Sequence, residues 1–115
     1  MTILRFYRRK QLEQGNMADF IVSEVLFDAE NKTPVRFVAL QICELNGKMH
    51  EIIKHDFAHG VYNVHRFFEN PGNKVEFPGI PISNGLIYSS KKDIMINWKD
   101  YKARFFTRHG PNINI

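Results

Sequence analysis

Four of the five histidines in this chain, His50, His55, His59 and His65, fall within sixteen residues of one another. Two of them belong to the run Lys54-His55-Asp56-Phe57-Ala58-His59-Gly60, which also supplies an ammonium group and a carboxylate. Histidine moves protons near neutral pH and is a common metal ligand. Imidazoles grouped with an acid and a cation are typical of a site for acid–base chemistry.

Metal-independent cleavage of RNA is the first chemistry that these residues favour. His59 and His65 would act as base and acid on the 2′-hydroxyl and the leaving oxygen, while Asp56 would fix a tautomer. Lys54 or Arg66 would stabilise the charge that develops on the phosphorane. This interpretation gives all five residues a catalytic role and requires neither a cofactor nor a metal.

Two other interpretations of the cluster stay open. A divalent metal could be held by His59, His65 and Asp56, although the chain lacks an established ligand motif such as His-Glu-x-x-His. Alternatively, the cluster is structural: Asp56 caps the turn, Gly60 supplies a positive φ, and the histidines bond turn carbonyls.

The cluster lies at a reversal between two predicted strands, Lys48–His55 and Val61–Glu69. Loops held by a rigid sheet are common places for functional sites. If the strands pair symmetrically about the turn, their side chains divide between two faces. One face would carry Lys54, Asn63, His65 and His50, and the other would carry His55, Tyr62 and Arg66. A one-residue slip would exchange the two faces, so the register stays open.

The remaining strands are predicted from hydrophobic patterns and turn residues. Ala18–Phe27 and Val35–Leu45 are rich in β-branched and aromatic residues. Asn46-Gly47 predicts a tight hairpin turn, because both residues tolerate the positive φ that it requires. Residues 1–10 are interpreted as a basic arm or an edge strand, and residues 70–90 as a Pro/Gly-rich loop that contains a short strand, Val75–Phe77.

A single helix is predicted near the C-terminus. Ser89 or Ser90 is expected to cap it, with Asp93 in the first turn. Its last turn is expected to carry Arg104 and Arg108, before Gly110-Pro111 ends it.

An apolar stripe at helical spacing, formed by Ile94, Trp98, Tyr101 and Phe105, is expected to pack on the sheet rather than to bind a ligand. The sequence thus predicts one α+β domain over residues 1–115. Its fold would be an antiparallel β-meander of about four to five strands with a C-terminal helix packed on one face.

Basic residues are concentrated at the two ends of the chain, which has a net charge of +4. Arg5, Arg8, Arg9 and Lys10 form the first group, and Lys91, Lys92, Lys99, Lys102, Arg104 and Arg108 form the second. Aromatic residues accompany both groups, a pattern compatible with an RNA or DNA partner. The alternative is an ordinary solvated surface.

Cys43 is the only cysteine and lies in a predicted buried strand, so we expect no internal disulfide and a reducing compartment. The first ten residues lack the apolar core of a signal peptide. No stretch approaches the roughly 18 apolar residues of a membrane span. We therefore expect a cytoplasmic protein without a membrane partner.

The run from Lys54 to Gly60, followed by His65, resembles a small prokaryotic family of uncharacterised domains. The signature of that family is a basic residue, an aromatic residue, Asp, then Ala-His-Gly and further histidines. The family includes the toxin components of TumE-type toxin–antitoxin pairs. Carried over by position, the resemblance points to Lys54, Asp56, His59, Gly60 and His65. This chain departs from the pattern at His55, where an aromatic residue is commoner, and at Arg66-Phe67, where a second histidine would be expected.

We therefore predict a small toxin-like protein that cleaves or binds RNA and is neutralised by an antitoxin-like protein partner. The alternative is a non-catalytic module that binds nucleic acid or protein, in which the histidines are structural. An exposed strand edge with aromatic side chains would also allow a homo-oligomer.

Overall fold

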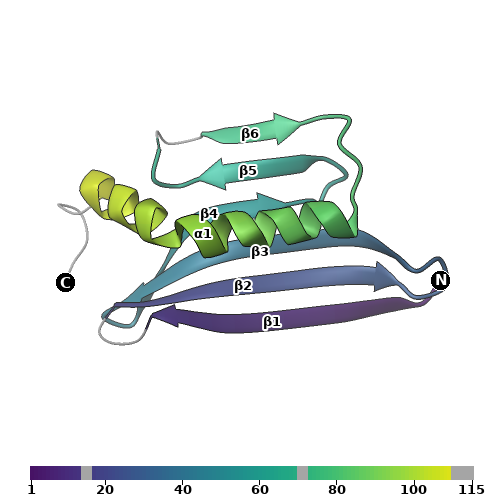
Figure 1. Ribbon diagram of the computed structural model, residues 1–115, viewed down its shortest axis with the longest axis horizontal. Coiled ribbons are helices and arrows are strands. Elements are labelled where there is room, and N and C mark those ends of the chain that lie inside the picture. The colour runs from purple at the N-terminus through teal and green to yellow at the C-terminus, as the bar shows by residue number, and fades with distance from the viewer. Residues whose placement is uncertain (14–16, 70–72, 110–115) are drawn as a thin grey trace.

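The computed structural model describes residues 1–13, 17–69 and 73–109. The described residues form one six-stranded antiparallel sheet and one helix packed against it (Figure 1). The strands follow one another across the sheet in chain order. They are β1 (Ile3–Glu13), β2 (Met17–Asp28), β3 (Thr33–Leu45), β4 (Lys48–Asp56), β5 (Tyr62–Arg66) and β6 (Lys74–Phe77). The helix is α1 (Asn84–His109).

The α+β class and the meander are confirmed, but the expected number of strands was too low. Most of residues 1–10 belong to β1, which is an edge strand, and Lys74–Phe77 forms the opposite edge as β6. Every residue from Met1 to Gln11 is exposed, so β1 lacks the buried alternation that identifies a strand in sequence.

The hairpin turn predicted at Asn46-Gly47 is confirmed. Asn46 has a φ of 52° and Gly47 a φ of 79°, and Leu45 pairs with Lys48 directly across the turn. Positive φ at both central residues gives the turn a twist that matches the two strands. This turn therefore fixes the register at one end of β3 and β4.

The same pair of strands contains a bulge in β4. Gln41 pairs with Ile53 and Ile42 pairs with Glu51, so Ile52 has no partner directly opposite. Ile52 and Ile53 are both fully buried although they are consecutive. A bulge of this kind shifts the alternation of side chains on the residues that precede it.

The helix begins earlier than the sequence predicted. Ser83 caps it, since its Oγ accepts the backbone N–H of Leu86 at 3.0 Å. Ser89 and Ser90 lie inside the helix, where their hydroxyls donate to the carbonyl oxygen of Leu86. The predicted loop of residues 70–90 therefore ends at this cap, and the short strand predicted within it, Val75–Phe77, is confirmed as part of β6.

Because α1 begins at Asn84, Asp93 does not lie in its first turn, which has no acidic residue. At the other end, Arg108 lies in the last turn as predicted, whereas Arg104 lies before it. Gly110 and Pro111, expected to end the helix, lie outside the described residues.

The apolar stripe of α1 packs on the sheet, as predicted. Ile94 is 0% exposed and Phe105 is 7% exposed, and both join a core with Ile53 and Val64. Trp98 and Tyr101 pack against the same core and are partly buried. Cys43 is fully buried in this core.

The sheet has one covered face and one uncovered face. The helix face carries the side chains that point toward α1, among them Ile21, Gln41 and His55. The open face carries the alternate residues, among them Val22 and Lys54. The helix contacts β2, β3 and β4, whereas β1 extends beyond its flank (Figure 1). Among the described residues, α1 is the sole helix, and it is not apolar enough to cross a membrane.

Candidate functional site

The register of β4 and β5 is offset by two residues from the symmetric pairing. Lys54 lies opposite His65, and His55 lies opposite Val64. An offset of two preserves the faces, so His65 shares the open face with Lys54, while Tyr62 shares the helix face with His55. His50 is the exception to the predicted grouping. It lies on the helix face, with its ring 5.8 Å from that of Phe105, because of the bulge at Ile52.

The turn between β4 and β5 has the capping carboxylate and the positive-φ glycine that were expected if the cluster is structural. Asp56 Oδ1 accepts the backbone N–H of Ala58 at 2.5 Å, and Gly60 has a φ of 82°. His59 is exposed on the turn. Capping and positive φ therefore explain Asp56 and Gly60 without any catalytic role.

Three of the predicted catalytic residues gather on the open face. The Lys54 Nζ lies 3.9 Å from the Asp56 Oδ2, and His65 is directly across the strand pair from Lys54. Lys74 of β6 pairs with His65 from the other side. His65 thus lies between two lysines in a row that crosses three neighbouring strands.

Partial burial lowers the pKa of His65 below its usual value, and the charges of Lys54 and Lys74 lower it further. The charge of Glu51 opposes this effect but does not cancel it. The ring of His65 also stacks on that of Phe67, with centroids 3.9 Å apart. A neutral imidazole between two ammonium groups can accept a proton beside a bound anion.

The other two predicted catalytic residues lie apart from this row. Arg66 lies opposite Ile53 on the helix face, where its Nε is 4.0 Å from the Glu69 Oε1. Among the described residues, no hydrogen bond or ring contact joins His59 to His65. Within the same part of the chain, no three His, Cys, Asp or Glu side chains converge as a metal site requires.

On the helix face, His55 belongs to a buried polar network that the sequence analysis missed. Its Nδ1 lies 2.8 Å from the Tyr62 hydroxyl, and its Nε2 lies 2.8 Å from the Asp93 Oδ2. Asp93 Oδ1 accepts hydrogen bonds from the Tyr101 hydroxyl at 2.7 Å and from the Asn97 amide at 3.0 Å. The network joins β4 and β5 to the middle of α1.

Burial alone would raise the pKa of Asp93, but the hydrogen bonds from His55, Tyr101 and Asn97 outweigh burial and lower it. Burial raises the pKa of Tyr62, and the charge of Asp93 raises it further. Asp93 is therefore an ionised acceptor at neutral pH. Because both ring nitrogens of the 5%-exposed His55 have partners, the network is arranged to hold the helix on the sheet.

A spacing signal for this network was present in the sequence. Asp93, Asn97 and Tyr101 recur at intervals of four residues, which places three polar groups on one side of a helix. The signal was obscured because Asp93 was assigned to the first turn, where a carboxylate is explained by the helix dipole.

The two basic ends of the sequence meet along the flank of α1. Arg8 and Lys10 of β1 pair with Ser23 and Ile21 of β2, which places them on the helix face. Lys91 of α1 lies across from them. Together with Met95, these residues line a groove, hereafter the basic groove, whose volume is about 220 Å³.

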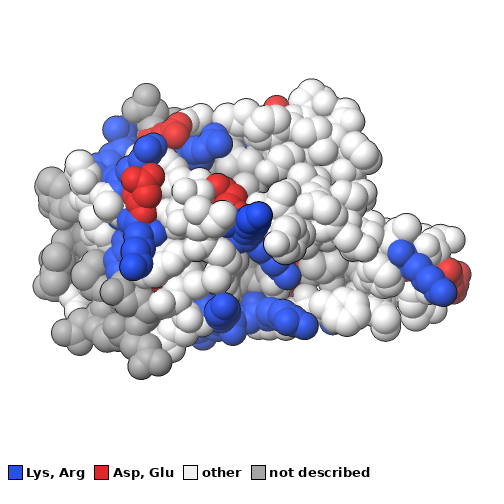
Figure 2. All heavy atoms as spheres, viewed as in Figure 1, with Lys and Arg blue, Asp and Glu red and all other residues white. Residues whose placement is uncertain are grey.

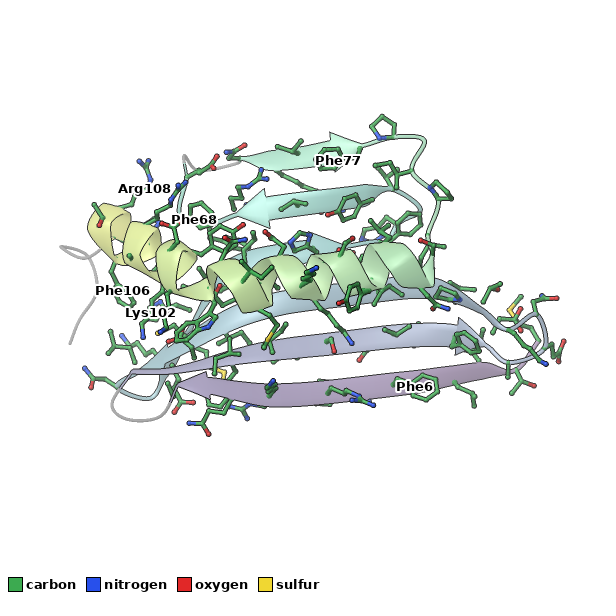
Figure 3. The ribbon with its side chains drawn as sticks, in the orientation of Figure 1. Phe6, Phe68, Phe77, Lys102, Phe106 and Arg108 are labelled. Carbon is green, nitrogen blue, oxygen red and sulfur yellow. The ribbon has the colours of Figure 1, made fainter. Side chains whose placement is uncertain are left out.

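Lys and Arg side chains gather over β1 and beneath the helix on the face drawn in Figure 2. Along α1, the groove residues Lys91 and Met95 are followed at helical spacing by Lys99 and Lys102. Lys102 Nζ reaches β2, where it lies 2.6 Å from the buried Asp19 Oδ2 (Figure 3). This flank therefore presents a line of cations beside the edge strand.

Comparisons with known proteins give one match. The model of a family described as a domain of unknown function matches residues 8–111. Neither the curated proteins nor the solved structures gave a match. The match confirms the expectation of an uncharacterised domain family, whereas it gives no support to the resemblance to TumE-type toxin components or to their signature.

Proposed function

The chain belongs to the family described as Domain of unknown function (DUF7718), and we propose that it is an RNA-binding domain. The observation that carries the proposal is the basic groove, where cations from both ends of the chain line one surface. Arg8, Lys10 and Lys91 line it, and none of the lining residues is acidic. Cations that follow one surface of a fold are the electrostatic pattern of nucleic-acid binders.

Unneutralised charge is the main argument for a polyanionic partner. Among the described residues, Arg8, Lys10 and Lys91 have no ion-pair partner, whereas Arg5 and Arg9 on the open face lie near Glu24 and Glu44. Lys and Arg side chains that neutralise RNA phosphates release the counterions condensed on the RNA, and this release provides most of the affinity of a non-specific complex.

Exposed aromatic rings beside the groove favour single-stranded RNA. Phe6 is 52% exposed and precedes Arg8 by two residues on the same face of β1 (Figure 3). Tyr88 is 67% exposed and lies about one helical turn before Lys91, beneath the Lys92 ammonium. Unpaired bases stack on exposed aromatic rings, which paired bases cannot do.

Fluorescence anisotropy with a single-stranded RNA oligonucleotide tests the proposal. The double variant Arg8→Gln/Lys91→Gln removes two groove cations. The control Arg9→Gln/Lys92→Gln removes the same charge from the neighbouring positions outside the groove. We expect the groove variant to reduce the slope of log K against log salt by about 1.4, at about 0.7 for each lost contact. Failure to bind RNA at low salt, or equal losses in both variants, would contradict it.

RNA cleavage centred on His65 is a second candidate function, which the lysines on either side of this imidazole favour. In this proposal His65 takes the 2′-hydroxyl proton as the 2′-oxygen attacks the phosphorus, and Lys54 and Lys74 stabilise the phosphorane charge. The bond from phosphorus to the 5′-oxygen then breaks, and the departing oxygen takes a proton from solvent. A toxin-like protein that is neutralised by an antitoxin-like partner would be a special case of this second function. Its support is the resemblance of the motif around Asp56. The row and the basic groove lie on opposite faces, so cleavage and binding are tested separately.

A cleavage assay with purified variants separates the two histidines of the original prediction. We expect His65→Ala to lose activity and His59→Ala to retain it, because His65 alone lies between lysines. The lowered pKa of His65 predicts that the rate rises with pH and reaches its plateau below the usual histidine range. Activity that survives in His65→Ala, or that is lost equally in both variants, would exclude this assignment.

A further inference from the structure

We propose that the basic groove is a pocket for the terminal phosphomonoester of an RNA strand. The inference rests on the RNA-binding function proposed above and specifies which part of the ligand the groove recognises. It follows from the shape, the charge and the lining of the groove.

The floor and walls of the groove come from three elements. Ile21 and Ser23 of β2 form the floor, and both are buried, at 7% and 6% exposure. Arg8 and Lys10 of β1 form one wall, and α1 forms the other through Lys91 and Met95. The Ser23 hydroxyl adds a hydrogen-bonding group to a pocket that is otherwise cationic and apolar.

The size of the groove suits a phosphate group with part of its sugar. Its volume is about 220 Å³, below the roughly 300–1,000 Å³ of pockets that enclose drug-sized ligands. A whole nucleotide with its base would therefore extend out of the groove, toward the surface that carries Phe6 and Tyr88.

The charge of the groove suits a dianion better than a monoanion. Three cations line it without a carboxylate among the lining residues. A phosphomonoester carries about −1.5 to −2 at neutral pH, whereas each internal phosphodiester carries a single charge. The terminal phosphate thus neutralises more of the mutual repulsion of Arg8, Lys10 and Lys91 than an internal phosphate does.

Repulsion of this kind acts on Lys91. Partial burial lowers the pKa of its ammonium, and the nearby charge of Arg8 lowers it further. A bound anion would reverse the second effect, because it would favour the protonated form.

Binding assays with three versions of one RNA oligonucleotide test the inference. The strand carries a 5′-phosphate, a 3′-phosphate or hydroxyls at both ends, and adenosine 5′-monophosphate serves as a soluble competitor. We expect at least one phosphorylated strand to bind about tenfold more tightly than the hydroxyl strand, a difference of about 1.4 kcal/mol. The competitor should displace that strand and shift the backbone NMR signals of Ser23 and Met95.

The matched variants decide whether the preference arises in the groove. Arg8→Gln/Lys91→Gln should abolish the preference, while Arg9→Gln/Lys92→Gln should keep it. Equal affinities of the three strands for the wild type would overturn the inference and leave the proposed RNA-binding function standing. A preference that persists in the groove variant would also overturn it. Absence of any RNA binding would remove the proposed function as well, so the two failures are distinguishable.

Discussion

Replacement of Asp93 by alanine is expected to destabilise the fold by about 2–3 kcal/mol. The carboxylate accepts hydrogen bonds from Tyr101 and Asn97 and lies 2.8 Å from the His55 Nε2. A hydrogen bond to a charged group contributes about 1.5–3 kcal/mol, so three would sum to more than the expected loss. We reduce the sum because the Asp93 side chain is 30% exposed, which lets water replace part of what is lost.

Urea unfolding followed by circular dichroism measures this change, and Asp100 supplies the control. Asp100 lies on the same helix and its Oδ2 is 3.1 Å from the Arg104 Nε, but both side chains are 58% exposed. An exposed pair at this spacing contributes about 0.3–0.5 kcal/mol, so Asp100→Ala should have a small effect. In a thermal scan, Asp93→Ala should lower Tm by roughly 8–12 °C.

Two milder variants keep the reasoning testable if Asp93→Ala does not fold. Tyr101→Phe removes one donor and is expected to cost about 1 kcal/mol. Asp93→Asn keeps an acceptor for Tyr101 and should fall between the wild type and Asp93→Ala. If Asp93→Ala were as stable as Asp100→Ala, the hydrogen bonds of Asp93 would not hold the helix on the sheet, and the expected loss of about 2–3 kcal/mol would be refuted.

Further predictions concern pH, a buried ion pair and two glycines. Because the pKa of folded Asp93 is lowered, its stabilisation is complete above its usual pKa of 3.8 and is lost as the pH falls through the folded value. Calorimetry should therefore show a steeper loss of stability with acid in the wild type than in Asp93→Asn. Lys102→Met leaves the 0%-exposed Asp19 without its ammonium partner and should cost about 3 kcal/mol in urea unfolding, more than Asp19→Asn/Lys102→Met. Gly47→Ala should cost about 1 kcal/mol because of its φ of 79°. Gly85→Ala should instead raise stability by about 0.5 kcal/mol or more, since an added Cβ meets only the Ser83 Oγ, at 3.7 Å.

Features set by local chemistry could be predicted from the sequence. The turn at Asn46-Gly47 depends on the φ values that two adjacent residues tolerate, and it formed where expected. The stripe through Ile94 and Phe105 depends on helical spacing, and it became the buried side of α1. The division of Lys54 and His55 between two faces depends on alternation alone, and it holds although the observed register differs by two residues from the symmetric pairing.

The start of the helix could not be predicted from local preferences. Ser89 and Ser90 have the chemistry of N-caps, whereas Gly85 weakens the helical pattern after the actual cap, Ser83. Burial of Ile87 and Ser90 against the rest of the fold stabilises the first turns of α1 in spite of this glycine. Tertiary packing therefore decided the boundary.

The candidate sites depended on contacts between distant segments. His55 and Asp93 are 38 positions apart, and no pattern around either residue identifies the other as its partner. Likewise, Arg8 and Lys91 were assigned to separate basic ends, and their meeting follows from the position of α1 beside β1. The charged groups could be identified from the sequence, but the residues that each group contacts depend on the fold.

The bulge at Ile52 has a consequence for changes in chain length. If β4 kept all its residues but had no bulge, Ile52 would pair with Ile42 and Glu51 would pair with Cys43. The side chain of Glu51 would then point into the core, and that of His50 would point toward solvent. Deletion of Ile52 alone would instead restore an unbroken ladder and leave every other side chain of β4 on its present face. Deletion of Ile53 gives the same sequence, so either change removes one buried isoleucine, whereas the loss of Lys54 or His55 would also transpose neighbouring polar and apolar groups. This strand can therefore be shortened by one residue at the Ile52-Ile53 pair, where the bulge lies.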